Sequence, residues 1–221
     1  MKFLCGLLYC FALTIAGMPS PANAQIELKV GQGAASPIRA KAIDAVAHID
    51  GPFAVTHLVI TVQNELPTNT EADFLYTLPD AAVVTTFAYY FGDEKVKAQI
   101  VEKQKAAQIY EGLTRVFRDP ALVEQVSHNR FRARIAPVMA NADLKVEMDI
   151  VQAIPIIGYS CSYTFPIDPQ SLDTMFDDVH LVVHLAANAG IASIANNVGL
   201  PMVSEPDGSR IELSGHNYHP Q

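Results

Sequence analysis

The residues best suited to chemistry in this chain are histidines. His180 and His184 are four residues apart, a spacing that would put two metal ligands on one face of a helix. The residues around them are mainly valine and leucine, which favours a strand instead, and residues four apart in a strand lie about 13 Å from each other. No glutamate stands between them to act as a general base. The spacing therefore predicts no metal site.

The remaining histidines suggest local roles. His48 and His57 flank a predicted turn at Gly51-Pro52, where we expect them to fix local hydrogen bonds. His216 and His219 lie in a polar C-terminal stretch and would bind a metal only opportunistically. We assign no metal-ligating residue from these positions.

Nucleophilic and cofactor chemistry have equally little support. The chain has no Gly-x-Ser-x-Gly elbow. Cys161 lies in an apparent strand and is expected to be a small buried residue. Gly31-Gln32-Gly33 lacks the third glycine and the following helix of a dinucleotide loop. We predict a non-enzyme with no catalytic residue and no cofactor. A secreted hydrolase with a dispersed carboxylate or histidine site is the alternative, and it would need a deep pocket.

The N-terminal segment is typical of a signal peptide. Lys2 precedes an apolar run over 3–17, and Ala22-Asn23-Ala24 is a small-x-small cleavage signature. The apolar run is shorter than a membrane-spanning helix. We therefore predict residues 1–24 as a leader cleaved after Ala24, a mature chain without a transmembrane span, and a location in the cell envelope, the periplasm or outside the cell.

Composition and charge narrow the class of protein. The chain is 50% hydrophobic and carries a formal charge of −8, so it can bury a core, and its acidity argues against nucleic acid and anionic lipid as partners. Both other cysteines lie in the leader, so Cys161 has no internal disulfide partner.

Hydrophobic periodicity indicates a mainly β fold. Leu58, Ile60 and Val62 alternate with polar or smaller residues, and over 143–150 apolar residues alternate strictly with charged ones, as in strands with one buried face. Further strands are expected in the following ranges: 72–78, 83–91, 95–101, 130–135, 179–185, 191–198 and 210–213. Turns are expected at 92–94 and 206–208. One amphipathic helix is predicted at about 102–116, from Glu102 to Val116, ended by Pro120. We predict an antiparallel β-sandwich with this helix packed against it.

A row of arginines is expected on one sheet surface. Arg130, Arg132 and Arg134 alternate with apolar residues and are separated from strand 143–150 by a short loop. We predict that these two strands pair antiparallel, with the arginines opposite acidic residues of the second strand. A basic ligand-binding patch is the alternative for this row, and Tyr89-Tyr90-Phe91 is the other surface candidate.

An ordered set of segments resembles the VIT domain of vault proteins and inter-alpha-trypsin inhibitor heavy chains, in its bacterial exported branch. The segments are DGPFAVTH (50–57), EADF (71–74), LP (78–79), EKQKA (102–106), IYE (109–111), DPALVE (119–124) and NRFRARIAP (129–137). The resemblance covers about residues 36 to 165. It implies a non-catalytic module for protein–protein interaction.

The resemblance also implies a domain organisation. We expect a VIT-like domain over 25–170 and further strands over 171–221 that complete the sandwich. VIT domains of this kind commonly precede a von Willebrand A-type domain, whose Asp-x-Ser-x-Ser motif is missing from this sequence. We therefore expect a fragment of a longer surface protein that has a protein partner or an adjacent A-type domain; a stand-alone module or assembly subunit is the alternative.

Overall fold

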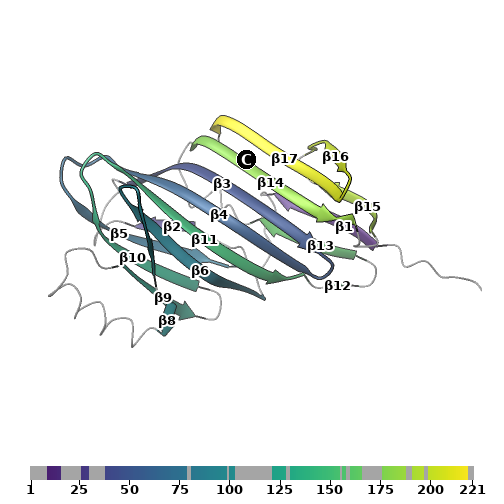
Figure 1. The fold of residues 1–221 in the computed structure, drawn as a ribbon, viewed down its shortest axis with the longest axis horizontal. Coiled ribbons are helices and arrows are strands. Elements are labelled where there is room, and N and C mark those ends of the chain that lie inside the picture. Colours follow the sequence, from purple (N-terminus) through teal and green to yellow (C-terminus); the bar gives the residue numbers. More distant parts are fainter. Residues whose placement is uncertain are drawn as a thin grey trace, which may run out of the picture.

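Strands dominate the computed structural model of the chain (Figure 1). The structure describes residues 9–15, 26–29, 38–78, 81–98, 100–102, 121–127, 130–154, 156–157, 160–165, 176–187, 191–196 and 199–218. Its strands form three sheets of eight, five and four strands, called here the large, second and third sheets.

The large sheet has the order β16-β17-β14-β3-β4-β11-β6-β7. Its strands are β3 (Ile38–Asp50), β4 (Phe53–Asn64), β6 (Ala82–Phe91), β7 (Glu94–Lys97), β11 (Asp143–Ala153), β14 (Phe176–Ala186), β16 (Met202–Glu205) and β17 (Gly208–Tyr218). Neighbours pair antiparallel except β3 and β14, which pair parallel. Segments from the start, middle and end of the chain thus share one sheet.

The two smaller sheets contain the other strands. The second sheet, of order β2-β5-β10-β9-β8, consists of β2 (Ile26–Lys29), β5 (Thr70–Thr77), β8 (Ile100–Glu102), β9 (Ala121–Ser127) and β10 (Arg130–Val138). The third sheet, of order β12-β13-β1-β15, consists of β1 (Tyr9–Ile15), β12 (Ile156–Ile157), β13 (Ser160–Phe165) and β15 (Ile191–Asn196).

Both smaller sheets pack against the same face of the large sheet. An apolar void of about 10 Å³ lies between the large and second sheets, lined by Phe87 and Met148 on one side and Phe74 and Phe131 on the other. The Tyr163 hydroxyl of the third sheet lies 2.7 Å from Thr56 Oγ1 of the large sheet. The predicted β-sandwich is confirmed, with its second layer divided into two sheets.

The alternation of apolar and polar residues in β4 and β11 places the apolar side chains in the core. Leu58, Ile60 and Val62 of β4 are at most 1% exposed, and Val146 and Met148 of β11 are equally buried. Each such side chain contributes about 1.5–3 kcal/mol when fully buried. The residues between them point to the opposite surface of the large sheet, called here the outer face.

Both predicted turns are confirmed. Gly92 has φ +59° and connects β6 to β7, so that Tyr90 pairs with Lys95. Gly208 has φ +157° and begins β17, where an added Cβ would lie 1.9 Å from the carbonyl oxygen of Leu185. Only glycine fits so close to a neighbouring backbone.

The predicted pairing of the arginine strand is wrong. β10 pairs with β5 and β9 in the second sheet, whereas β11 pairs with β4 and β6 in the large sheet. Both edges of β11 are therefore hydrogen-bonded to other strands of the large sheet. The chain between β10 and β11 crosses from one layer of the sandwich to the other. The predicted strand 95–101 is also divided, because β7 ends at Lys97 and β8 belongs to the second sheet.

Two predictions concern segments that are only partly described. Of the predicted helix 102–116, Glu102 ends strand β8, and 103–116 lie outside the described residues. Of the predicted leader 1–24, Tyr9–Ile15 forms strand β1 between β13 and β15, and the other residues lie outside the described part. Cleavage and export remain predictions. Within the described ranges, no helix has the length and apolar character that a membrane crossing requires.

Candidate interaction surface

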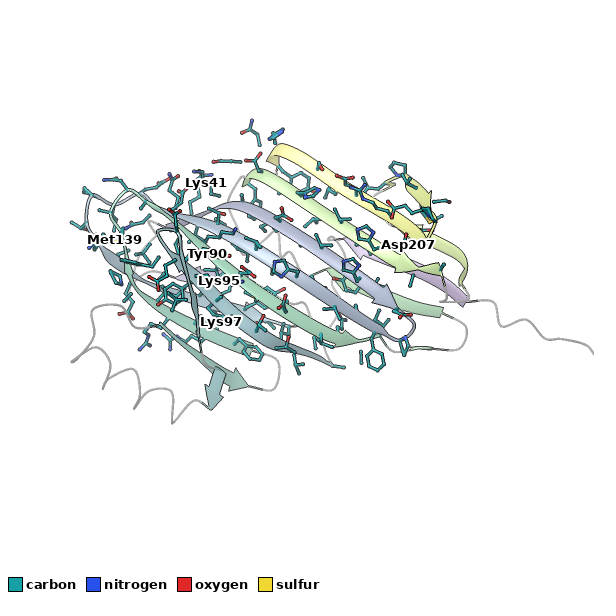
Figure 2. All side chains as sticks on the ribbon, in the orientation of Figure 1. Lys41, Tyr90, Lys95, Lys97, Met139 and Asp207 are labelled. Atoms are coloured by element: carbon teal, nitrogen blue, oxygen red, sulfur yellow. The ribbon has the colours of Figure 1, made fainter. Side chains whose placement is uncertain are left out.

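The outer face of the large sheet gathers the polar side chains that could recognise a partner. Figure 2 shows Tyr90, Lys95 and Lys97 near one side of this sheet and Asp207 on the β16–β17 hairpin at the other. Because successive residues of a strand point to opposite faces, the same alternation that builds the core presents these side chains outward.

A hydrogen-bonded network, called here the Tyr90–Glu147 network, connects β6, β7 and β11. The Tyr90 hydroxyl donates to Glu147 Oε2 at 2.8 Å, and Lys95 Nζ donates to Glu147 Oε1 at 2.5 Å. Lys145 Nζ lies 4.7 Å from the centroid of the Tyr90 ring, within the range of a cation–π contact. The Glu147 side chain is only 14% exposed, so the network is held in one arrangement.

The electrostatics of Glu147 follow from these contacts. Burial raises the pKa of this carboxyl, but the hydrogen bonds from Lys95 and Tyr90 favour its charged form, and the net pKa is lowered. The hydrogen bond to Glu147 raises the pKa of Tyr90 and that of Lys95. The three groups therefore stabilise one another as carboxylate, neutral phenol and ammonium.

His57 joins the same network through two carboxylates. Its Nδ1 lies 2.7 Å from Asp149 Oδ1, and its Nε2 lies 3.7 Å from Glu147 Oε1. Thr86 donates to the other Asp149 oxygen at 2.5 Å. Burial raises the pKa of Asp149, whereas the hydrogen bonds from Thr86 and His57 lower it, with a net lowering. Both ring nitrogens of His57 therefore face carboxylate oxygens.

An apolar patch lies next to this network. It consists of Phe53 and Val55 of β4, Val83 of β6 and Val151 of β11. Val151 pairs in register with both Val55 and Val83. Phe53, Val55 and Val83 are 56%, 46% and 53% exposed. An exposed apolar cluster bordered by polar groups is a common mark of an interaction site.

Further histidines lie on β3 and β14 of the outer face. His180 Nε2 lies 3.1 Å from Glu212 Oε1, and its Nδ1 lies 3.6 Å from Asp44 Oδ1. The His48 and His184 rings stack with centroids 4.8 Å apart. His180 and His184 thus lie on a strand, as predicted, and have different partners.

The residues singled out from the sequence are distributed over several surfaces. Of the Tyr89-Tyr90-Phe91 cluster, Tyr89 is 3% exposed in the core, and only Tyr90 enters the network. Arg134 lies on the second sheet, with Nε 3.1 Å from Glu71 Oε1, so its expected acidic partners on β11 are wrong. Those acids instead contact other residues, as Asp143 does with Lys41 at 2.6 Å.

The apolar patch was not predicted from the sequence. The sequence pattern that could have indicated this patch lies in β4, where Phe53 and Val55 are apolar on the phase opposite to Leu58 and Ile60. When apolar residues occupy both alternating phases at one end of a strand, the outer surface there is apolar as well as the inner one.

An open depression lies on the outer face beside Tyr90. It has a volume of about 290 Å³, borders the Tyr90–Glu147 network and is lined by Tyr90, Gly92, Asp93, Asp143 and Lys145. Among the described residues, no group of three or more histidines, cysteines or acids is placed to hold a metal ion.

Comparison with known proteins identifies the family. The family model described as the vault protein inter-alpha-trypsin (VIT) domain matches residues 40–150, which run from the third residue of β3 through β10 and into β11 as far as Ile150. No curated protein sequence matches the chain.

Two solved structures that resemble the chain have low sequence identity to it. A candidate nutrient-binding protein from Legionella pneumophila is 11% identical, with a TM-score of 0.49 over 90% of this chain and 70% of that one. An M1 zinc metallopeptidase from Deinococcus radiodurans is 7% identical, with a TM-score of 0.39 over 80% of this chain. The match spans 39% of the length of that peptidase. The family model covers half of this sequence, and the chain therefore belongs to the VIT domain family.

Proposed function

We propose that this chain is an exported, non-catalytic protein–protein interaction module that scaffolds or presents a von Willebrand A-type domain at the cell surface or in the envelope. The VIT family suggests an interaction module. The observation that carries the proposal is the exposed apolar patch beside the fixed Tyr90–Glu147 network on one face of the large sheet.

The patch and the network together match the anatomy of a binding interface. Such interfaces have an apolar centre and a polar rim, with tyrosine among the enriched residues. Phe53 and Val83 supply exposed apolar area, and Tyr90, Glu147 and His57 supply the rim. Because the rim is already ordered by hydrogen bonds, binding would cost little side-chain entropy there.

The surface suits recognition better than reaction. The depression beside Tyr90 is open to solvent, whereas sites for small molecules enclose most of their ligand. On this basis the outer face would meet another protein surface, and we expect an A-type domain to bury the patch.

The test is a binding measurement with matched variants. The full chain would be immobilised and titrated with a purified A-type domain from the same organism. The variant Phe53→Ser/Val83→Ser removes the exposed apolar groups. The control Arg134→Ser changes a half-buried residue on the second sheet, away from the outer face of the large sheet. Truncating central interface residues costs at least about 1–2 kcal/mol, so we expect roughly tenfold weaker binding for the double variant and unchanged binding for the control.

Two results would count against the proposal. Equal binding by all three proteins would place the contact elsewhere, and no binding by the unmodified chain would remove the proposed partner. Light scattering comes first, because a dimer that dissociates in the double variant would identify a second copy of the chain as the occupant of the patch. Export is tested separately, by sequencing the N-terminus of the secreted protein for a start at Gln25.

A further inference from the structure

A pair of stacked imidazoles lies on the outer face, away from the Tyr90–Glu147 network. His48 of β3 and His184 of β14 are register partners on adjacent parallel strands. Their ring centroids are 4.8 Å apart with an interplanar angle of 7°. The His184 side chain is 34% exposed, and His48 is exposed. Two solvent-accessible imidazoles at neighbouring positions are a potential chelating pair for a metal ion.

A carboxylate sets the chemistry of one ring. Glu205 Oε2 lies 3.5 Å from His184 Nδ1. This negative charge favours the tautomer that carries its proton on Nδ1, which leaves the lone pair of Nε2 for a ligand. Histidines that bind metals commonly direct their other ring nitrogen toward a carboxylate in this way.

Two other outer-face histidines are engaged differently. His180 has Glu212 at 3.1 Å from one ring nitrogen and Asp44 at 3.6 Å from the other. His57 is likewise placed between Asp149 and Glu147. In each case carboxylates occupy both sides of the ring, whereas the His48–His184 pair presents two imidazoles to each other.

We propose that His48 and His184 form a two-histidine site for a late first-row divalent cation such as Zn²⁺, Ni²⁺ or Cu²⁺. Imidazole nitrogen is a preferred ligand for these ions. No third protein ligand converges on the pair within the described residues, so water completes the coordination. Glu205 acts as the positioning residue for His184.

Binding requires the two rings to rotate out of their stacked arrangement. A shared ion lies in the plane of each ring at about 2.0–2.1 Å from nitrogen, so parallel rings must tilt toward each other until the nitrogens are about 3.4 Å apart. The torsion that rotates a histidine ring is broad, and exposure leaves room for the movement. Arg210, the register partner of His184 on β17, has its Nη2 paired with Glu212, which offsets its positive charge.

The experiment is a calorimetric titration of the full chain with NiCl₂ at neutral pH. His48→Phe and His184→Phe each keep an aromatic ring for stacking and remove the nitrogens. His180→Phe is the matched control, because it lies on the same strand and face four residues away. Circular dichroism checks that each variant is folded.

We expect the unmodified chain and His180→Phe to bind Ni²⁺ equally, and each pair variant to bind at least about tenfold more weakly, equivalent to about 1.4 kcal/mol. Unchanged binding in both pair variants, or an equal loss in His180→Phe, would overturn the proposal. Electron paramagnetic resonance of the Cu²⁺-loaded unmodified chain is a second readout that needs no variant. Coupling to two imidazole nitrogens is expected, and coupling to one would overturn the pair as a site.

Discussion

Asn64, the last residue of β4, connects the end of the large sheet to two loops and is 0% exposed. Its Nδ2 lies 3.1, 3.2 and 2.9 Å from the carbonyl oxygens of Thr68, Val138 and Met139. Its Oδ1 accepts from the Leu66 N–H at 3.0 Å. One side chain therefore satisfies backbone groups from two segments that are distant in sequence.

We predict that Asn64→Ala strongly destabilises the fold. The amide has two N–H groups for three acceptors, so about three full hydrogen bonds are lost, each worth about 0.5–1.5 kcal/mol, and buried backbone groups are left unpaired at about 1–3 kcal/mol each. A loss of about 3–5 kcal/mol in the free energy of unfolding follows. For a chain of this size that lowers Tm by roughly 6–20 °C.

The assay is urea unfolding followed by far-ultraviolet circular dichroism, since the chain has no tryptophan. Asn69→Ala is the matched control, because Asn69 makes an exposed hydrogen bond to the Ala140 N–H at 3.0 Å and should lose less than about 1 kcal/mol. An Asn64→Ala variant within about 1 kcal/mol of the unmodified chain, or no more destabilised than the control, would refute the reasoning.

Two further predictions concern pH. The pKa of Glu147 is lowered in the folded chain from the ordinary value of 4.5. Its contribution to stability is therefore present above that value and is lost as pH falls through the folded pKa. In urea titrations at a series of pH values, Glu147→Gln should lose less stability than the unmodified chain as pH falls, and an equal loss in both proteins would contradict this. Burial raises the pKa of Tyr163 from 10.0 to about 12, so stability should decline as pH rises above the ordinary value and the unfolded tyrosine ionises. Tyr163→Phe should remove that part of the decline while costing about 1 kcal/mol near neutral pH through the lost contact with Thr56, and alkaline urea titrations of both proteins test it.

Local patterns predicted the strands and their buried faces. The alternation over 143–150 becomes β11, with its apolar residues inside and its charged residues on the outer face. The turn at Gly92 and the hairpin that follows it were equally readable. These features depend on residues close in sequence, because side-chain direction alternates along a strand whatever that strand pairs with.

Strand pairing could not be predicted from the same patterns. Sequential strands usually pair, yet β10 and β11 lie in different sheets, and the large sheet instead brings β14 beside β3. The alternation along a strand predicts which face is buried, but it does not predict which neighbouring strand hydrogen-bonds to its backbone. Several partners of similar pattern were available, and the packing of the whole core selects among them.

The candidate sites also divide into features that local sequence patterns predict and contacts that only strand pairing decides. The sequence by itself determined that His184 lies on a strand and that Phe53 and Val55 are apolar on the phase opposite to Leu58 and Ile60. Only the tertiary structure decided that the two histidines stack and that Val151 connects Val55 to Val83. Side-chain direction is a local property of a strand, whereas contact across strands depends on register among segments far apart in the chain.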